Sequence, residues 1–396
     1  MKRNIAWYET AFNFSVVFKI GTEGYMIYLD NAATTFPKPP EVISAMTELM
    51  QKYGGNPGRG GHRLSRECGE KVFECRENMA KLIGVSNPER IIFTKNATEA
   101  LNLAIKGSVR RGDEIIISSM EHNSVLRSAV NLEKNGVTVK IARADNTGFV
   151  SVDSVLRAIT PRTKLICIIH ASNVVGTVNP IEDICRAARA RNIITLIDCA
   201  QTGGILPING AALDMAAFAG HKGLYGPFGT GVLYIREGIS LNTLTEGGTG
   251  SMSESALMPD ILPDRYEAGT VNACGIAGLN EGIRFVMREG VCEKEAYLTN
   301  MLAEKLSEIK GLRVLGTHGV GVIGAVLSDM DCVEVSSLLD SRYDIATRAG
   351  LHCSPMAHRT LGTVTKGMLR LSVGYFNTKE DIDAAAAAIE EVLSNK

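Results

Sequence analysis

The sequence predicts an α/β protein with a large domain on a mostly parallel seven-stranded sheet and a smaller C-terminal α/β domain. Between residues 90 and 235, short β-branched runs alternate with helical patterns, which is typical of a parallel sheet covered on both faces. After about residue 285, the order changes to a long helix, short strands and further helices. A chain of 396 residues can bury the cores of two such domains.

Each strand expected in the large domain is a short run dominated by β-branched or apolar residues, the composition of a strand buried on both faces. We expect these strands at residues 90–94, 114–118, 138–142, 165–170, 193–197, 215–219 and 231–235. Helical patterns connect several of them, at residues 97–107, 124–135 and 181–191.

The smaller domain is expected to combine short strands with long helices. The strands are predicted at 312–315 and 324–328, and the helices at 293–310, 333–341 and 379–393. A GxGxxG match at 319–324 leads into a strand, whereas a dinucleotide-binding fingerprint requires a helix there, so we interpret it as a turn.

We divide the chain into an extension, a segment that joins the smaller domain, the large domain and the smaller domain, at 1–25, 26–45, 46–284 and 285–396. Met26 stands directly before a strand-like run, and we therefore place residues 1–25 outside the fold. Polar residues interrupt the apolar stretch of this extension, which makes it a poor signal peptide.

Charge and cysteine usage exclude several classes of function. The chain has 42 Lys and Arg against 43 Asp and Glu, so no basic field attracts nucleic acid or an anionic membrane, and we expect a small-molecule substrate. No apolar run approaches the roughly 20 residues that span a bilayer. The nine cysteines form no CxxC pair, which argues against disulfides and a structural metal site and favours the cytoplasm.

Polar residues follow five of the predicted strands, at 96–99, 121–123, 172–173, 198–201 and 221–222. In an open α/β sheet, ligands bind in the crevice beyond the carboxyl ends of the strands. A helix cap or a solvated turn would explain any one of these groups. Five groups at one edge predict a ligand site.

Lys222 and Asp198 suggest the chemistry of this site. Lys222 follows an apolar strand and enters a glycine-rich turn, where desolvation would lower its pKa and favour a Schiff base. Asp198 closes another apolar strand, where it could keep a pyridine nitrogen protonated, although a helix cap or a buried salt bridge would also account for it. Together the two residues suggest pyridoxal phosphate as the cofactor.

Thr98 and His122 are further candidates. Thr98 lies at a strand-to-helix turn, where backbone N–H groups could bind a phosphate, or where Asn96 and Glu99 could simply cap the helix. His122 could stack on a planar ring, move protons, or serve only the structure.

Cys353 and Arg370 complete the candidates. Glycine and proline mark residues 348–355 as a loop, and Arg348 and nearby histidines would favour the reactive thiolate of Cys353, although an ordinary loop cysteine is the alternative. Arg370 on an apolar strand could bind a substrate carboxylate with two hydrogen bonds, or form a buried salt bridge.

With these residues in place, the chain resembles the cysteine desulfurase and selenocysteine lyase-like members of the class V aminotransferases, within the fold-type I pyridoxal phosphate enzymes. The resemblance runs from Tyr28 to the C-terminus. It is carried by LDNAATT at 29–35, GNP at 55–57, MEH at 120–122, SNVVG at 172–176, DCAQ at 198–201, GHK at 220–222, EAGT at 267–270 and RAGLHC at 348–353.

The resemblance implies roles for individual residues. The implied cofactor contacts are Lys222 at the aldehyde, Asp198 at the pyridine nitrogen, Gln201 at the phenolic oxygen, His122 on the ring face, Thr98 and His221 at the phosphate with Ala97 beside them, and Thr270 at the neighbouring subunit's phosphate. The implied substrate contacts are Asn173, Arg370 and Asn31. Ala219 departs from the pattern, because relatives often place a phosphate-binding serine there.

The implied activity is a pyridoxal phosphate-dependent cysteine desulfurase that converts L-cysteine to L-alanine and leaves the sulfur on Cys353 as a persulfide. A selenocysteine lyase, another aminotransferase or a β-lyase are the alternatives within the fold, and Leu351 and Ser354 leave the choice between sulfur and selenium open. Two alternatives belong to other classes of protein. One is a nucleotide-dependent oxidoreductase, and the other is a sulfur-carrier or scaffold protein without catalytic activity. We expect a cytoplasmic homodimer and a sulfur-acceptor protein that the sequence does not identify.

Overall fold

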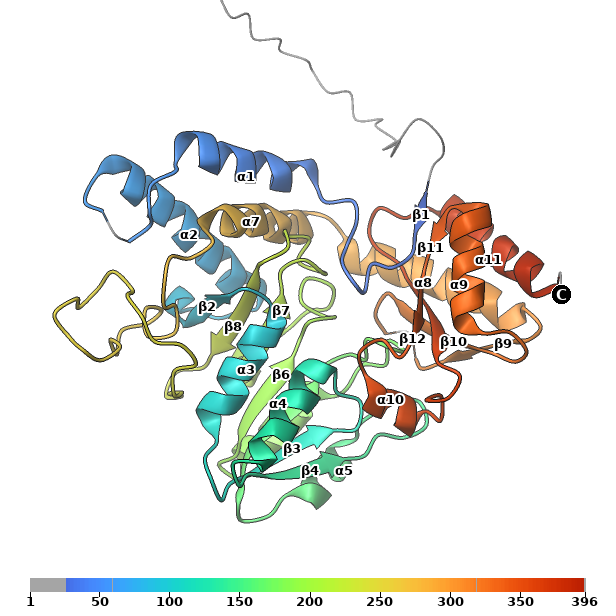
Figure 1. The fold of residues 1–396 in the computed structure, drawn as a ribbon, viewed down its shortest axis with the longest axis horizontal. Coiled ribbons are helices and arrows are strands. Elements are labelled where there is room, and N and C mark those ends of the chain that lie inside the picture. The colour runs from blue at the N-terminus through green and yellow to red at the C-terminus, as the bar shows by residue number, and fades with distance from the viewer. Residues whose placement is uncertain (1–25, 59, 318, 395–396) are drawn as a thin grey trace, which may run out of the picture.

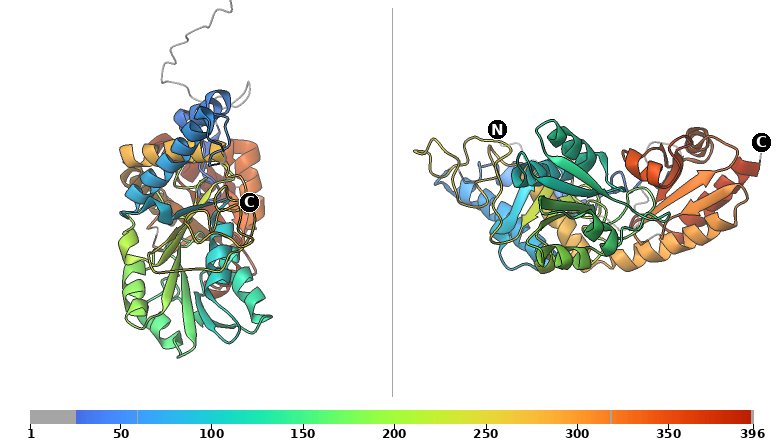
Figure 2. Two further views of the ribbon diagram at one scale, coloured as in Figure 1. Left: turned by 90° about the vertical axis from the view of Figure 1, so that its left-hand side faces the viewer. Right: turned by 90° about the horizontal axis from the view of Figure 1, so that it is seen from below.

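The computed structural model describes residues 26–394 with the exception of 59 and 318. The predicted extension at 1–25 lies outside these residues. The described chain forms two bodies side by side, one around a seven-stranded sheet and the other around a four-stranded sheet (Figure 1, Figure 2).

The large sheet has the order β2-β8-β7-β6-β5-β3-β4, and only β8 runs antiparallel to its neighbours. Its strands are β2 (Ile91–Thr94), β3 (Glu114–Ser118), β4 (Thr138–Ala142), β5 (Thr163–Ile169), β6 (Ile194–Asp198), β7 (Met215–Ala219) and β8 (Gly231–Ile235). All seven predicted strands are present, four of them with the predicted bounds. The mostly parallel sheet confirms the predicted fold class.

Helices cover both faces of this sheet, because alternate strand residues belong to different cores. Ile116 packs with one group of helices, whereas Ile115 and Ile117 pack with the other. The first group consists of α2 (Arg63–Leu82), α5 (Val152–Ala158), α6 (Ile181–Arg189) and α7 (Ala273–Arg288). The second consists of α3 (Ala97–Ser108) and α4 (Asn123–Glu133), and α1 (Pro40–Lys52) packs on α7.

The smaller sheet is antiparallel, in the order β12-β13-β10-β9. Its strands are β9 (Leu312–Leu315), β10 (Val322–Leu327), β12 (Arg348–Gly350) and β13 (Met368–Ser372). Its helices are α8 (Val291–Glu308), α9 (Cys332–Tyr343), α10 (Pro355–Thr360) and α11 (Lys379–Ser394). Short 3-10 turns occur at Pro88–Arg90 and Gly210–Ala212.

Two sequence expectations about the smaller body have different outcomes. β10 begins inside the GxGxxG match, so a strand follows it, as expected for a turn. The loop predicted at 348–355 is wrong in its first part, because Arg348–Gly350 pairs with β13 as β12. Three residues are too few to show a strand period in the sequence.

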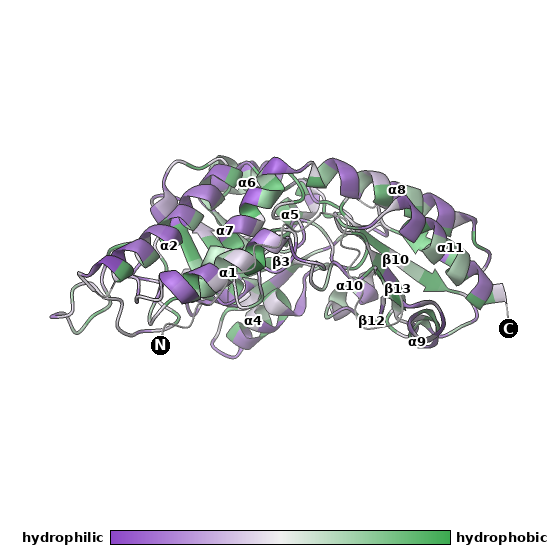
Figure 3. Cartoon of the chain, turned by 90° about the horizontal axis from the view of Figure 1, so that it is seen from above, coloured by the Kyte–Doolittle hydropathy of each residue, from purple (hydrophilic) through white to green (hydrophobic). Residues whose placement is uncertain are grey.

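The N-terminal segment belongs spatially to the smaller body. β1 (Ile27–Tyr28) pairs in parallel with β11 (Ile345–Ala346), and Asp30 forms a bridge with Ser372 beside them. In Figure 3, α8 turns a hydrophobic stripe toward the sheet, which agrees with the burial of Leu298, Leu302 and Leu306 one turn apart. None of the described helices is long and apolar enough to cross a membrane.

A buried ion pair ties α2 to the segment before α7. The Arg76 guanidinium donates to both carboxylate oxygens of Glu267, at 2.7 and 2.5 Å, and each side chain is only 5% exposed. The Phe93 N–H donates to the same carboxylate, and its ring lies under the guanidinium. Removal of Glu267 therefore leaves a buried cation without its counter-charge.

We expect Glu267→Ala to lower the free energy of unfolding by about 3 to 5 kcal/mol, because a broken buried pair leaves one charge desolvated. Denaturant titration followed by circular dichroism measures this loss. Glu254→Ala, at an exposed residue of the same region, is the control and should change little. Equal stability of the two variants would show that the ion pair contributes nothing net.

Candidate active site

A cavity of about 230 Å³ lies at the carboxyl ends of the large-sheet strands, where the smaller body meets them. The carboxyl ends of four strands and the segments after them supply most of its lining: Asn96, Ala97 and Thr98 after β2, His122 and Ser124 after β3, Asp198, Ala200 and Gln201 around the end of β6, and Ala219, His221 and Lys222 around the end of β7. Asn173, Arg348, His352 and Arg370 close the other side. The structure thus brings most of the predicted site residues to one cavity.

The turn that carries Lys222 is fixed by its backbone. The His221 carbonyl accepts from Thr35 N at 3.1 Å, from Thr34 Oγ1 at 3.0 Å and from Lys38 Nζ at 2.8 Å. A side chain at Gly223 would approach the Gly203 carbonyl oxygen to 2.5 Å, so the turn packs directly on the backbone that follows β6. The position of Lys222 is therefore set by contacts of its neighbours.

The amine of Lys222 has an unusual protonation equilibrium. Burial lowers its pKa to about 8, and the positive charge of Arg370 acts in the same direction, whereas Asp198 opposes the shift. A lysine amine with this pKa is partly neutral near pH 7 and can act as a nucleophile or a base.

Asp198 ends β6 with its side chain buried. Its Oδ1 accepts from the Ala200 N–H at 2.9 Å, and no ion pair joins it to a basic side chain of the described chain. Burial raises its pKa, while the Ala200 N–H and the charge of Lys222 lower it. The salt-bridge alternative for Asp198 therefore finds no protein cation in the structure.

His122 and Thr98 meet through one hydroxyl. Ser124 Oγ lies 2.8 Å from Thr98 Oγ1 and 2.8 Å from His122 Nδ1, which also caps α4 by accepting from Ser124 N. Burial lowers the pKa of His122 to about 4, and the charge of Lys222 adds to the shift. His122 is thus neutral at pH 7 and can lie against a planar ring without a charge.

The N-terminus of α3 shows both features that the sequence left open. Asn96 accepts from Glu99 N at 2.9 Å, and Glu99 accepts from Lys95 N at 2.6 Å, which is the predicted capping arrangement. The amides of Ala97 and Thr98 open the helix, where they have no partner within it. The cap and an anion site therefore coexist.

His221 and Gln201 differ in how their polar atoms are engaged. The His221 Nδ1 is buried and has no hydrogen-bond partner among the described residues, and burial lowers the pKa of this ring to about 4. Gln201 Nε2 donates to the Ala32 carbonyl at 3.1 Å. The unpaired nitrogen of His221 is therefore available for a hydrogen bond to a ligand.

Cys353 is exposed on a backbone that both His352 and Cys353 take into positive φ, at 51° and 56°. Asn173 Nδ2 donates to the His352 carbonyl at 2.8 Å, and Asn173 Oδ1 accepts from Ser354 Oγ at 2.8 Å. The Arg348 guanidinium lies 3.7 Å from the thiol sulfur. The side-chain amide of Asn173, on the large body, thus binds the residue before Cys353 and the residue after it. The backbone of the exposed Cys353 is strained.

Arg370 is almost fully buried and is only partly satisfied. Its Nη2 donates to Asp30 Oδ1 at 2.6 Å and its Nη1 to the Asn173 carbonyl at 3.0 Å. Its Nε is buried without a partner in the described part of the chain. The predicted salt bridge therefore exists, and one donor of the fork is still free.

Three predicted residues do not line the cavity, namely Cys353, Asn31 and Thr270. Asn31 donates to Tyr28 and Ser372 carbonyls and accepts from Phe36 N, so its amide joins backbone segments. Thr270 is exposed, with its hydroxyl 3.4 Å from the Asn56 amide nitrogen. A contact to another subunit stays a prediction for Thr270, as substrate binding does for Asn31.

Sequence reasoning missed Lys38, Ser124 and the role of Glu121. Lys38 stands between two prolines, in a segment that shows neither the helical nor the strand periodicity of apolar residues. Burial lowers the pKa of its amine to about 7. The sequence marks Glu121 only as a polar residue at a strand end. In the structure Glu121 is buried, and its Oε1 accepts a hydrogen bond from Ile169 N at 2.8 Å. Burial raises the pKa of this carboxyl to about 8. The described residues contain no cluster of three or more metal-ligating side chains.

Comparison with known proteins gives consistent matches. The family model for class-V aminotransferases matches residues 27–385. A probable cysteine desulfurase from Methanothermobacter thermautotrophicus is 35% identical over 379 residues, which cover 92% of this chain and 94% of the relative. A cysteine desulfurase from Yersinia pestis is 34% identical over 384 residues, 93% of each chain.

Two solved structures share the fold over nearly their full length. The apo cysteine desulfurase from Thermococcus onnurineus superimposes with a TM-score of 0.86 at 31% identity, covering 94% of this chain and 95% of that one. The cysteine desulfurase CsdA (S-sulfonic acid) from Escherichia coli gives a TM-score of 0.84 at 26% identity, covering 93% and 95%.

In protein from which any bound ligand has been removed, we expect reductive methylation of Lys222 by formaldehyde to rise with pH around a midpoint near 8, because only the neutral amine reacts and burial lowers the pKa to about 8. Asp198→Asn should move this midpoint to lower pH, because the carboxylate favours the ammonium form. Peptide mapping at each pH measures the extent of labelling. A midpoint at the ordinary lysine value of 10.5, unmoved in Asp198→Asn, would contradict the interpretation.

Proposed function

Because the chain belongs to the class-V aminotransferase family, and within it to the cysteine desulfurases, we propose that it removes sulfur from L-cysteine and releases L-alanine with pyridoxal phosphate as cofactor. One observation carries the proposal. A lysine amine with a lowered pKa and a buried carboxylate that makes no ion pair with a described residue lie at adjacent strand ends, beside a loop that bears an exposed thiol.

The unsatisfied groups of the cavity fit the cofactor. Asp198 offers a buried negative charge to a protonated pyridine nitrogen, and Gln201 lies near it for the phenolic oxygen. The amides of Ala97 and Thr98, together with the unpaired Nδ1 of His221, suit a phosphate. When bound, pyridoxal phosphate supplies an electron sink for the bond electrons released at the substrate Cα.

Protein groups would handle the protons and the ring. Lys222 Nζ would hold the cofactor aldehyde and would take the proton from the substrate Cα, a role that suits its lowered pKa. Neutral His122 would lie on the ring face, and Asp198 would keep the ring nitrogen protonated. Thr270 of a second subunit would complete the phosphate site in a homodimer.

Arg370 is the proposed anchor of the substrate carboxylate. Its free Nε and its almost complete burial support a charge-assisted hydrogen bond to that carboxylate. Asn173 holds the Cys353 loop and has one remaining N–H for the same carboxylate. Asn31 would contribute to substrate binding indirectly, by holding the backbone at Ser372 in place.

Cys353 would accept the sulfur. Its thiolate forms an S–S bond to the substrate sulfur while the Cβ–S bond breaks, the electron pair of that bond remains on Cβ, and protonation of Cβ gives alanine. The persulfide then stays on Cys353. The Arg348 guanidinium lies 3.7 Å from the sulfur.

Selenocysteine lyase is the second candidate, because the same residues serve a Cβ–Se bond. Nothing in the cavity lining selects sulfur over selenium, so turnover of both substrates decides between them. We also place the protein in the cytoplasm, since all nine cysteines are unpaired, and we expect a sulfur-acceptor protein to take the persulfide sulfur.

We expect Cys353→Ala to lower alanine release from cysteine by at least about 100-fold, because it removes the nucleophile and leaves the cofactor site intact. The measurement is alanine formation, with cysteine and selenocysteine supplied in parallel and persulfide mapped by mass spectrometry. Cys292→Ala, at a partly buried cysteine of α8, is the matched control. Full cysteine desulfuration by Cys353→Ala with bound cofactor would refute the persulfide step.

We expect Arg370→Lys to raise the KM for cysteine by about 10- to 100-fold, because a charge-assisted hydrogen bond contributes about 1.5 to 3 kcal/mol. Cysteamine lacks the carboxylate, so its turnover should change much less in the same variant. The visible absorbance of the bound cofactor reports whether the site is still folded. Equal effects on cysteine and cysteamine would assign Arg370 a structural role only.

A further inference from the structure

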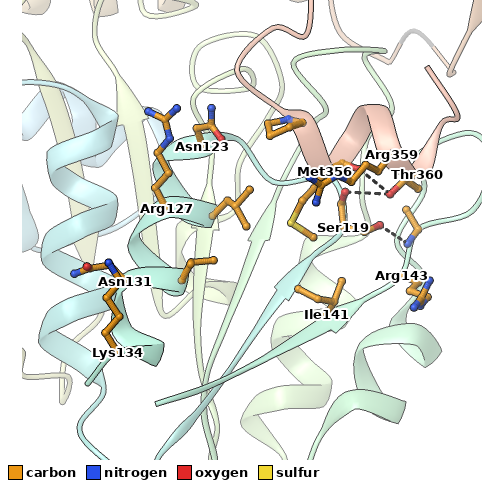
Figure 4. A pocket seen from close by; sticks show the side chains of 14 residues that line it. Ser119, Asn123, Arg127, Asn131, Lys134, Ile141, Arg143, Met356, Arg359 and Thr360 are labelled. Atoms are coloured by element: carbon orange, nitrogen blue, oxygen red, sulfur yellow. Dashed lines mark hydrogen bonds between the residues drawn. The ribbon is translucent and has the colours of Figure 1, made fainter. Parts of the chain in front are cut away.

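A second and larger hollow, of about 920 Å³, lies between α4, the edge strand β4 and α10 (Figure 4). Four cations line it: Arg127, Lys134, Arg143 and Arg359. We call this hollow the basic groove. Its floor carries apolar side chains, of which Val130 and Ile141 are 44% and 38% exposed.

The positive charge of the basic groove is not balanced by the protein. No carboxylate lines the groove, and none of its four cationic side chains makes a hydrogen bond or an ion pair with another described residue. Asp145, close to Arg143 in sequence, is engaged with the backbone of Thr147 and Phe149 instead. A concentration of one sign of charge in a concave surface attracts a partner of the opposite sign.

The basic groove and the cofactor cavity share a wall, and Cys353 lies on it. Asn123 lines the groove and donates its N–H to the Cys353 carbonyl at 2.8 Å, while the next residue, Ser124, lines the cavity. Likewise, His352 lines the cavity and Pro355 lines the groove. The backbone of Cys353, whose side chain is exposed, therefore lies between the cofactor cavity and the basic groove.

The groove suits a protein segment better than a small anion or a nucleic acid. A small-ligand site converges buried polar groups on its ligand, whereas all four cations here are exposed and individually weak. Exposed apolar side chains surrounded by cations are typical of a protein interface. No aromatic residue lines the groove to stack on bases.

We propose that the basic groove docks an acidic, partly apolar segment of the protein that takes the sulfur from Cys353. This rests on the proposed function. In the transfer, a thiolate of the docked protein attacks the outer sulfur of the Cys353 persulfide, a new S–S bond forms, the old one breaks, and Cys353 leaves as a thiolate. Docking in the groove brings that thiolate to the exposed side of the loop.

The probe is a short synthetic peptide with glutamates, leucines and one cysteine, compared with a counterpart in which glutamine replaces each glutamate. With the cysteine-fed holoenzyme, the glutamate peptide should gain sulfur about tenfold faster, because electrostatic attraction raises encounter rates by this order or more. The advantage should fall at high salt. Mass spectrometry of the peptide persulfide gives the rates, and fluorescence anisotropy gives binding without turnover.

The groove variant is Arg143→Glu combined with Arg359→Glu, and the control is Arg157→Glu combined with Lys310→Glu, at exposed cations outside the groove. The groove variant should lose the tenfold advantage and the control should keep it. Alanine release with dithiothreitol as acceptor should stay unchanged in both. If the unmodified enzyme released no alanine with dithiothreitol, the proposed function would be refuted. Fluorescence anisotropy would still show whether the peptide binds in the groove.

Three results would overturn the docking proposal while dithiothreitol-supported turnover is normal. One is an equal rate for the two peptides in the unmodified enzyme, and another is an advantage that survives in the groove variant. The third is an RNA oligonucleotide that displaces the bound glutamate peptide at a lower concentration than unlabelled glutamate peptide does. Dissociation of a dimer in the groove variant would likewise assign the surface to a second copy of this chain.

Discussion

The cost of burying two opposite charges at neighbouring strand ends governs the active site. Asp198 ends β6 and Lys222 follows β7, which is adjacent to β6 in the sheet, and each loses hydration in the cavity. Desolvation favours the neutral form of each residue, so it raises the pKa of Asp198 and lowers the pKa of Lys222. The attraction between the two opposite charges limits both shifts. The result is an amine that is easily deprotonated beside a carboxylate that still needs a cation. Chemistry that requires both a base and an acid partner can start from this pair.

The smaller body supplies what the sheet edge lacks. Arg370 comes from β13, and Cys353 follows β12, so both belong to the four-stranded sheet although they face the large body. Asn173 is the link, because its side chain binds the Cys353 loop and its carbonyl binds Arg370. Any change in the position of one body relative to the other would therefore move the carboxylate anchor and the thiol together.

The sequence allowed most of the architecture to be predicted, and the reason is physical. A strand buried on both faces, such as β3 with Ile115, Ile116 and Ile117, has a composition that few other structures tolerate. The polar residues at the strand ends located the cavity, because parallel strands bring their carboxyl ends to one edge. The lysine and aspartate were recognisable since charges rarely follow such apolar runs.

Other features depended on contacts that no local pattern contains. The strand β12 exists through its pairing with β13, and Lys38 matters because the fold brings it to the His221 carbonyl. Asn31 illustrates the opposite case, since a motif pointed to it and its amide is taken up by backbone groups. The basic groove was equally invisible, because Arg359 is distant in sequence from the other three cations and the chain has nearly balanced charge.

The pairing of β1 with β11 has a consequence for biosynthesis. Asn31 contacts Ser372 across a separation of 341 residues, and Asp30 contacts Arg370 across 340. Such distant partners make the last steps of folding slow, since a long loop must close before they form. The amino end, although made first, can take its place only when nearly the whole polypeptide has left the ribosome. Arg370 therefore gains the counter-charge of Asp30 only in a nearly complete chain.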